Sequence, residues 1–280
     1  MRPIRPILTF FSFMAQLVAG AACLGAPVPN ASAPEAPAAA PPQAALPMDF
    51  AAEVAALQSA LISEVPHLIL DDANRKQQWL ARTAAALAAA GIVLDRPQLL
   101  VVVDRNPRVQ QMRIVLAQPQ GEWDDLGGGK VSTGKPGRYE HFLTPAGVFR
   151  HTDAILDWRA EGSFNAHHVR GLGEEGMRVW DFGWQRAVKG WRSARKVGRM
   201  RLLVHATDPE SLAQRLGRAA SEGCIRIPEA MNLFLDRHGV LDADYEQAAK
   251  RNPRFQKVLL PDRSPTPLAG DMLVVIDSSL

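Results

Sequence analysis

The chain contains little cysteine, with only Cys23 and Cys224 among its 280 residues. Cys23 lies at the edge of the apolar N-terminal stretch, so an exported chain would keep one effective thiol, Cys224, with no internal partner. This scarcity excludes a disulfide-stapled scaffold. Cys224 is then either an inert buried cysteine or a nucleophile.

Long apolar runs are also scarce, because beyond the first residues no segment reaches the ~18 apolar residues that a spanning helix needs. The N-terminus combines Arg2 and Arg5 with an apolar core at residues 7–18 and small residues after it, a pattern typical of a secretory signal. We expect a signal peptide at residues 1–22 and a periplasmic or envelope location. Lipidation at Cys23 and an uncleaved membrane anchor are the alternatives.

Signatures of metal and nucleotide sites are missing as well. The histidines form no HExxH motif and have no cysteine partners, which argues against zinc. Residues 129–135 resemble a phosphate-binding loop, but Pro136 follows the lysine where a hydroxyl would have to bind magnesium. The net charge of +3 is too small to indicate nucleic acid. We therefore expect no cofactor, no metal and no nucleic-acid partner.

Composition divides the rest of the chain into three parts. Residues 23–47 are rich in proline and alanine and predict an extended linker. Residues 48–97 show helical periodicity and predict a helical hairpin, either packed on the following domain or serving as a spacer. Residues 98–280 change to a β pattern, so the predicted fold class is mainly β, a β-rich α+β fold with a short N-terminal helical segment.

The most informative stretch is residues 199–228. An apolar run at 200–204 predicts a buried strand that ends at His205, and a short helix is expected at 210–216. The following residues alternate in polarity, so a strand there would place Cys224 and Arg226 on one face. This arrangement suits acyl transfer: His205 takes the thiol proton, Cys224 attacks a carbonyl, and backbone amides around Gly223 hold the oxyanion.

Residues 154–198 are the least regular part and end in a basic run that precedes the His205 strand. They could form a lid over a cleft or an ordinary solvated face, and the sequence leaves both open. A basic strip beside a cleft fits an acidic substrate better than nucleic acid.

The stretch resembles the catalytic domain of L,D-transpeptidases of the YkuD type, whose signature is a histidine, a gap, and then Ser/Thr-His-Gly-Cys. The resemblance extends over about residues 99–276, including VSTGKPG at 131–137, TPAGVF at 144–149 and MLVVI at 272–276. One position departs from the signature, since Glu222 stands where the family has its second histidine. The matching signature residues are His205, Ser221, Gly223, Cys224, Ile225 and Arg226.

The resemblance implies a mixed β-sandwich and a cysteine-dependent enzyme, expected as a monomer, that forms a thioester with a peptidoglycan stem tetrapeptide and passes it to an amine. It also implies that the carbonyl of Ala206 fixes the His205 tautomer and that Ser221 and Gly223 support the oxyanion site. Arg226 would bind a substrate carboxylate or, alternatively, pair with Asp236 or Glu229.

Other functions remain possible on this sequence. An L,D-carboxypeptidase, another Cys-His hydrolase of wall peptides and a non-catalytic peptidoglycan-binding protein are the alternatives. Glu222 keeps the last one open, because a carboxylate beside the sulfur would raise the pKa of the thiol, although it could instead pair with His205.

Overall fold

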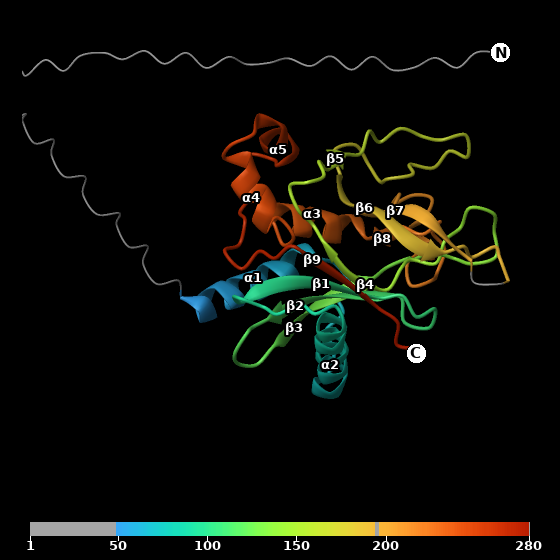
Figure 1. Ribbon diagram of the computed structural model, residues 1–280. Helices are drawn as coiled ribbons and strands as arrows, with labels where there is room; N and C mark the ends of the chain where they lie inside the picture. The colour runs from blue at the N-terminus through green and yellow to red at the C-terminus, as the bar shows by residue number, and fades with distance from the viewer. Residues whose placement is uncertain (1–48, 194–195, 280) are drawn as a thin grey trace, which may run out of the picture. The chain divides into compact units, whose positions relative to one another are not determined.

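Two β-sheets form the centre of the fold in the computed structural model, which describes residues 49–193 and 196–279 (Figure 1). The expected signal peptide and the whole of the expected linker, residues 23–47, lie outside the described residues. The first sheet has the strand order β3-β2-β1-β9-β4 and the second β5-β6-β7-β8. The strands are β1 (Gln98–Asp104), β2 (Gln111–Ala117), β3 (Asp124–Lys130), β4 (Gly147–Arg150), β5 (Trp158–Arg159), β6 (Arg178–Val188), β7 (Val197–Ala206), β8 (Ile225–Ile227) and β9 (Met272–Ile276).

Each sheet is mixed, with one parallel pair among antiparallel ones. Strands β1 and β2 form an antiparallel hairpin that pairs from Gln98↔Ala117 to Asp104↔Gln111. The MLVVI motif at 272–276 forms β9, which lies between β1, its parallel partner, and β4, its antiparallel partner. All five β9 residues are buried, as expected for a central strand whose two faces are both covered.

One face of each sheet contributes to a shared apolar core. Val101 and Ile114 from the first sheet and Leu202, Val204 and Ile225 from the second belong to one cluster of buried side chains. The helix α3 (Glu229–Arg237), which follows β8 directly, adds Met231, Phe234 and Leu235 to the same cluster. The strands that carry the candidate site are therefore fixed from behind by the main core of the protein.

The two N-terminal helices do not form the expected hairpin. Helix α1 (Phe50–Glu64) buries Leu57 and Leu61 in the core shared by the two sheets. Helix α2 (Ala73–Ala89) buries Trp79 and Leu87 against the opposite face of the first sheet (Figure 1). The hairpin prediction was wrong because periodicity identifies an apolar stripe on each helix but not the surface that the stripe meets.

A buried arginine joins this helical segment to the sheet. Arg113 on β2 forms ion pairs with Asp71, just before α2, and with Asp125 on β3, and its guanidinium lies 5.0 Å from the Trp79 ring centroid. The helices therefore belong to the same compact unit as the sheets and are not a separate spacing module.

Three further differences from the sequence-based expectations concern local structure. The helix expected at 210–216 is a single 3-10 turn at Ala213–Arg215. The stretch 154–198, expected to be irregular, contains the 11-residue strand β6. The short helices α4 (Ala243–Ala249) and α5 (Pro253–Val258) were not predicted. None of the helices in the described part of the chain is both long enough and apolar enough to cross a membrane.

Candidate active site

His205 sits near the end of β7, as predicted, with its side chain buried. Its Nδ1 lies 2.7 Å from the carbonyl oxygen of Ala206. A carbonyl only accepts, so Nδ1 must donate, and Nε2 keeps its lone pair. The hydrogen bond expected between His205 and Ala206 is therefore present, and it leaves the imidazole able to accept a proton at Nε2.

Arg226 is the register neighbour of His205 across the parallel pair β7–β8. Because Ile225 and Ile227 point into the core, Cys224 and Arg226 lie on the opposite face, together with His205. This agrees with the expected sharing of one face by thiol and guanidinium. The nucleophile, the base and a cation are thus neighbours on one surface of the second sheet.

The Cys224 thiol lies just before the β7–β8 ladder begins at Val204↔Ile225. Its Sγ donates to the carbonyl of Arg201 at 3.8 Å, and the backbone amide of Leu203 points at the sulfur. Among the described residues, the thiol of Cys224 therefore forms its hydrogen bond with the backbone of β7 and not with the imidazole of His205. Catalytic hydrogen bonds are often long in unliganded sites and tighten when substrate binds.

Burial keeps both reacting groups neutral. Desolvation, helped by the positive charge of Arg226, lowers the pKa of His205 to about 4. Desolvation also raises the pKa of Cys224 to about 11, with smaller raising contributions from Glu222 and Asp181 and lowering ones from Leu203 and Arg226. At neutral pH the pair is a thiol beside a neutral imidazole, so the thiol must lose its proton during attack.

The loop before Cys224 is held by the upstream segment 131–137. Ser132 and Arg226 exchange two backbone hydrogen bonds of 2.9 Å, and the amide of Lys135 donates to the carbonyl of Ser221 at 2.9 Å. Gly134 packs so closely that a Cβ there would lie 2.0 Å from the Phe142 carbonyl oxygen. A segment about ninety residues earlier in the chain thus forms one wall of the nucleophile loop.

Thr144, the first residue of the motif at 144–149, holds the same loop in place from a second segment of the chain. Its hydroxyl donates to the carbonyl of Gly223 at 2.6 Å and accepts from the amide of Gly134 at 2.9 Å. Thr144 is buried, so these partners have no solvent to replace it. Thr144 was not among the predicted site residues, although it begins the TPAGVF motif that carries part of the resemblance.

Ser221 and Gly223 shape the turn, and the geometry changes the role expected for the Gly223 amide. Ser221 Oγ accepts from the Gly223 amide at 3.1 Å and donates to the Cys224 carbonyl at 2.5 Å. The Gly223 amide is therefore already engaged, and the Cys224 amide is the better oxyanion donor. Gly223 has a φ of 140°, and a Cβ there would lie 2.8 Å from Met200, which together require glycine.

Arg226 pairs with neither of the acids considered as structural partners. Asp236 pairs with Arg159, Arg178 and Arg263 instead. Within the described residues Arg226 forms no ion pair, and its Nε is buried without a hydrogen-bond partner. A partly buried guanidinium in this state is available to a carboxylate from outside the protein.

Glu222 lies on the exposed side of the nucleophile loop. Its backbone carbonyl accepts from the amide of Phe142 at 2.9 Å. In the part of the chain that the structure describes, no contact joins its carboxylate to the buried His205. The pairing considered from sequence is therefore absent, and Glu222 affects the site through its charge.

Two hollows open on the outer face of the second sheet. The first has a volume of about 520 Å³, contains Cys224 and Glu222, and is bordered by the β6–β7 hairpin through Trp184, Arg199 and Arg201. The second, of about 370 Å³, lies between β5 and the loop at 161–173.

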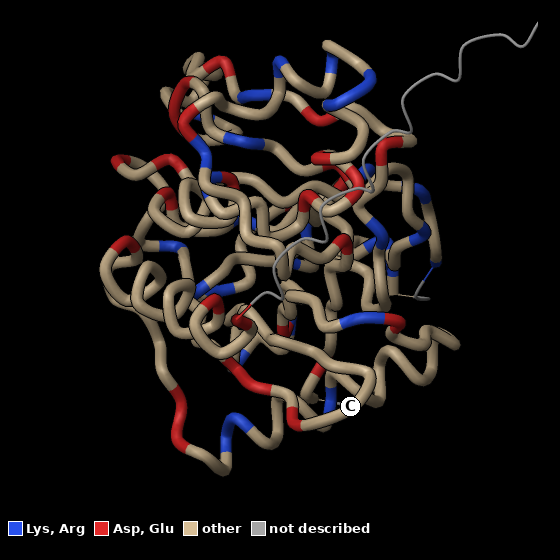
Figure 2. The backbone as a smooth tube through the Cα atoms, turned by 90° about the vertical axis from the view of Figure 1, so that its left-hand side faces the viewer, with Lys and Arg blue, Asp and Glu red and all other residues tan. Residues whose placement is uncertain are grey.

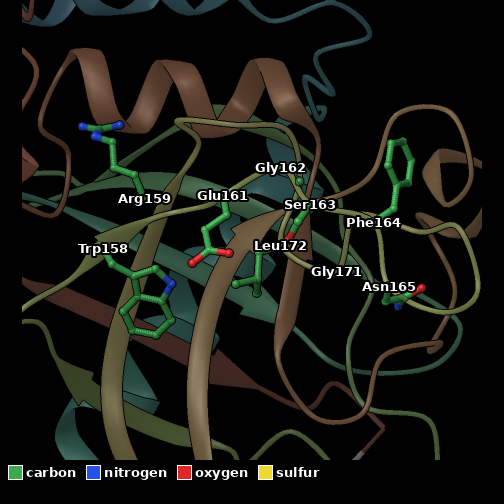
Figure 3. A pocket seen from close by; sticks show the side chains of 10 residues that line it. Trp158, Arg159, Glu161, Gly162, Ser163, Phe164, Asn165, Gly171 and Leu172 are labelled. Atoms are coloured by element: carbon green, nitrogen blue, oxygen red, sulfur yellow. The ribbon is translucent and has the colours of Figure 1, made fainter.

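Figure 3 shows the second hollow, into which Trp158, Glu161 and Leu172 project, while Arg159 points away toward α3. The Trp158 ring also lies 5.2 Å from the guanidinium of Arg201. This contact joins a residue that lines the second hollow to one that lines the first. The stretch 154–198, for which lid and solvated face were both considered, thus supplies walls of both hollows.

No model of a known protein family matches the sequence, and no curated protein matches it either. The assignment of a function therefore depends on the chemistry of the site.

Proposed function

We propose that the protein is a cysteine-dependent acyltransferase of the L,D-transpeptidase type, acting on peptidoglycan stem peptides in the cell envelope. One observation carries the proposal. Cys224 shares a face with a neutral His205, whose tautomer is fixed by Ala206, and with Arg226, which has no ion-pair partner within residues 49–193 and 196–279. The shared core between two mixed sheets is compatible with the β-sandwich that the resemblance implies.

The chemistry assigns one role to each of these groups. Nε2 of His205 takes the thiol proton as Sγ of Cys224 attacks the carbonyl before the terminal D-Ala, and the Cys224 amide holds the oxyanion. The C–N bond then breaks, the imidazolium returns the proton to the leaving amine, and a thioester remains. An amine acceptor, or water in the L,D-carboxypeptidase alternative, resolves the thioester and restores the thiol.

Arg226 is suited to bind a carboxylate of the stem, because it is desolvated and has no acidic partner among the described residues. Stem peptides carry carboxylates, and a guanidinium binds them with paired hydrogen bonds. The same placement would suit other Cys-His hydrolases of acidic wall peptides. A non-catalytic binding protein is the remaining alternative, supported by the raised pKa of the thiol.

A carbapenem tests the proposal, because its strained β-lactam is an activated amide that such a thiol opens to a stable thioester. We expect the purified protein to gain the mass of one carbapenem, as measured by intact-protein mass spectrometry. Cys224→Ala should abolish the adduct and His205→Ala should slow it by about a hundredfold or more, the range of general-base contributions.

Tetrapeptide stems provide the second arm of the test. Wild-type protein should release D-Ala, and the products should show whether cross-linked dimers also form. Absence of both the adduct and D-Ala, in a protein that still sediments with sacculi, would replace the enzyme with the binding protein.

A further inference from the structure

The hairpin formed by β6 and β7 carries positive charge that the proposed reaction does not use. Residues 184–201 contain seven lysine or arginine residues and no aspartate or glutamate. The whole chain has a net charge of only +3, so the rest of the chain is net negative. In Figure 2 blue segments gather at this hairpin, on the right of the view. The positive charge is therefore concentrated in one part of the fold.

The register of the two strands decides which side chains share a face. Residues two apart on a strand lie on one face, and so do residues directly opposite each other on neighbouring strands. The inward face of the hairpin contributes Ala187 and Met200 to the core. The outward face consists of three cross-strand pairs, Trp184↔Arg201, Arg186↔Arg199 and Val188↔Val197. These six residues form what we call the hairpin face.

Arg186 and Arg199 lie directly opposite each other on the hairpin face. Like charges in directly opposite positions destabilise a sheet. Both side chains are exposed, and neither forms an ion pair with any described residue. Arg201, by contrast, is neutralised by Asp181, whose carboxylate lies 2.8 Å from its Nε. The fold therefore keeps two adjacent cations without a counter-charge, and an anionic group from outside the protein would stabilise them.

The hairpin face also exposes apolar side chains between its charges. Trp184 is 60% exposed and Val197 is 47% exposed. The guanidinium of Arg199 lies 5.5 Å from the ring centroid of Trp184, so the cation and the aromatic ring form one amphipathic unit. Tyr139, which is 73% exposed, adds a further aromatic ring, because it meets the ring of Trp191 edge-on at 5.6 Å. Exposed tryptophan and tyrosine beside basic residues are typical of surfaces that lie at a membrane–water interface.

The charge and the apolar exposure together indicate the chemistry of the partner. A polyanion in water would bind the arginines but would leave the ring of Trp184 and the valines in contact with water. A bilayer with anionic headgroups satisfies both groups, because its phosphates meet the arginines while the apolar side chains enter the interfacial region.

We propose that the hairpin face docks on a membrane surface that contains anionic phospholipids. Arg186 and Arg199 bind headgroup phosphates, and Trp184 and Val197 enter the interface. This inference goes beyond the proposed function and does not depend on it. Trp184 and Arg199 also border the hollow that contains Cys224, so docking would hold the thiol at the membrane surface.

Sedimentation with lipid vesicles tests the inference. The protein is used without residues 1–23, because their apolar stretch would bind lipid itself, while the compact unit that contains both sheets is retained whole. One set of vesicles contains equal parts of phosphatidylglycerol and phosphatidylcholine, and the other contains phosphatidylcholine alone. We expect the anionic vesicles to bind the protein at least about tenfold more strongly. This binding should weaken about tenfold when NaCl rises from about 0.05 M to about 0.5 M, because salt screens exposed charges.

Two matched double variants separate the hairpin face from the general charge of the protein. Arg186→Gln with Arg199→Gln should lower the partition coefficient for anionic vesicles about 25-fold, at about fivefold for each arginine near an anionic surface. Arg251→Gln with Arg254→Gln removes the same charge from exposed positions after α4 and on α5, and should keep the partition coefficient within about twofold of wild type. Vesicle binding should shift the tryptophan fluorescence of the wild type to the blue, and Trp184→Phe should remove this shift.

Thermal unfolding shows whether the paired arginines serve the fold instead. Because like charges lie opposite each other, Arg186→Gln with Arg199→Gln should leave Tm unchanged or raise it. A clear fall in Tm would assign the arginines to the stability of the hairpin and would overturn the inference.

Other results would also overturn the membrane surface. These are a wild-type protein that does not bind anionic vesicles, and equal losses of binding in the two double variants. Binding to isolated sacculi that requires Arg186 and Arg199, without vesicle binding, would assign the hairpin face to the wall polymer instead. No readout here involves acyl transfer, and Cys224→Ala should bind vesicles as wild type does. Failure of this inference is therefore distinguishable from failure of the proposed function.

Discussion

Thr144 and Gly223 are joined by a hydrogen bond of 2.6 Å across 79 residues of sequence, and the same hydroxyl accepts from Gly134. This one buried side chain connects both upstream segments to the turn that presents Cys224. Thr144 touches no reacting atom, so it acts as a positioning residue.

Replacing Thr144 should therefore misplace the thiol. Thr144→Val keeps the side-chain shape but leaves the Gly223 carbonyl and the Gly134 amide unpaired, which costs about 1–3 kcal/mol for each buried group. We expect the carbapenem acylation rate to fall about tenfold, equivalent to ~1.4 kcal/mol. Thr144→Ser should restore it to within about twofold. A valine variant that reacts at the wild-type rate would show that the bond does not position the loop.

The pKa values of the catalytic pair predict an unusual pH profile. The pKa of His205 is lowered to about 4 and that of Cys224 is raised to about 11, both mainly by burial. The acylation rate should rise as pH passes about 4, where the imidazole loses its proton, and then stay level to about pH 10.

His205→Ala should change the shape of this profile. Without the base only the thiolate fraction reacts, so the rate should increase about tenfold per pH unit through the neutral range. The measurement is the pseudo-first-order rate of carbapenem adduct formation between about pH 3 and 10, which covers the rise expected at the pKa of His205. A wild-type profile with the same tenfold slope would contradict a role for His205 as base.

Glu222 should matter little for acylation, because no contact joins its exposed carboxylate to His205 within the described residues. Glu222→Ala and Glu222→His should both keep the carbapenem acylation rate within about threefold, whereas a pairing role would cost about a hundredfold or more. Removing the charge should also lower the pKa of Cys224, since Glu222 adds to the effect of burial. Iodoacetamide alkylation as a function of pH measures that change.

We expect the stability of the folded protein to depend on pH through His151. This histidine is fully buried, with Nδ1 at 2.8 Å from the Leu241 carbonyl oxygen and Nε2 at 2.9 Å from Asp157. Both partners accept, so both ring nitrogens carry protons and the imidazole is cationic. Burial disfavours this charge, but Asp157 and Asp242 outweigh it and raise the pKa of His151.

The pKa of His151 in the folded protein is higher than its value of about 6.5 in the unfolded chain. The protonated imidazole therefore stabilises the folded protein fully at pH values below about 6.5, and this stabilisation is lost as the pH rises through the folded-state pKa. Arg178 opposes the imidazolium, and the Tyr245 ring stacks on it at 4.4 Å. His151→Gln should lower stability by about 3–5 kcal/mol at pH 6. Thermal unfolding from pH 6 to 10 should show that the difference in stability between wild type and variant becomes smaller as the pH rises. A difference that stays constant would contradict the assignment of a positive charge to His151.

The sequence predicted the parts of the site that depend on local pattern. The alternation around Ile225 and Ile227 placed Cys224 and Arg226 on one face, and the apolar run before His205 placed the histidine near a strand end. The β pattern expected from residue 98 onward is also present, and its clearest examples are the continuous apolar runs of β1 and β9, which central strands with two buried faces need.

The missed features depend on tertiary partners or on broken patterns. Strand β6 was overlooked because its register with β7 shifts between Asp181 and Trp184, which interrupts the alternation. The engagement of the Gly223 amide by Ser221 is a side-chain geometry that no periodicity encodes. Which face of the sheet each N-terminal helix covers is decided by packing alone.

The central position of β9 makes folding of the first sheet depend on residues 272–276. β9 lies between β1 and β4, yet it follows β1 by about 170 residues along the chain. Until residues 272–276 pair with them, β1 and β4 each present an unpaired edge, and the first sheet is incomplete. Such edges pair readily with other chains, and a sheet closed by so distant a contact forms slowly. Chains halted before residue 272 should therefore aggregate, with β1 exposed, and should not accumulate as folded fragments.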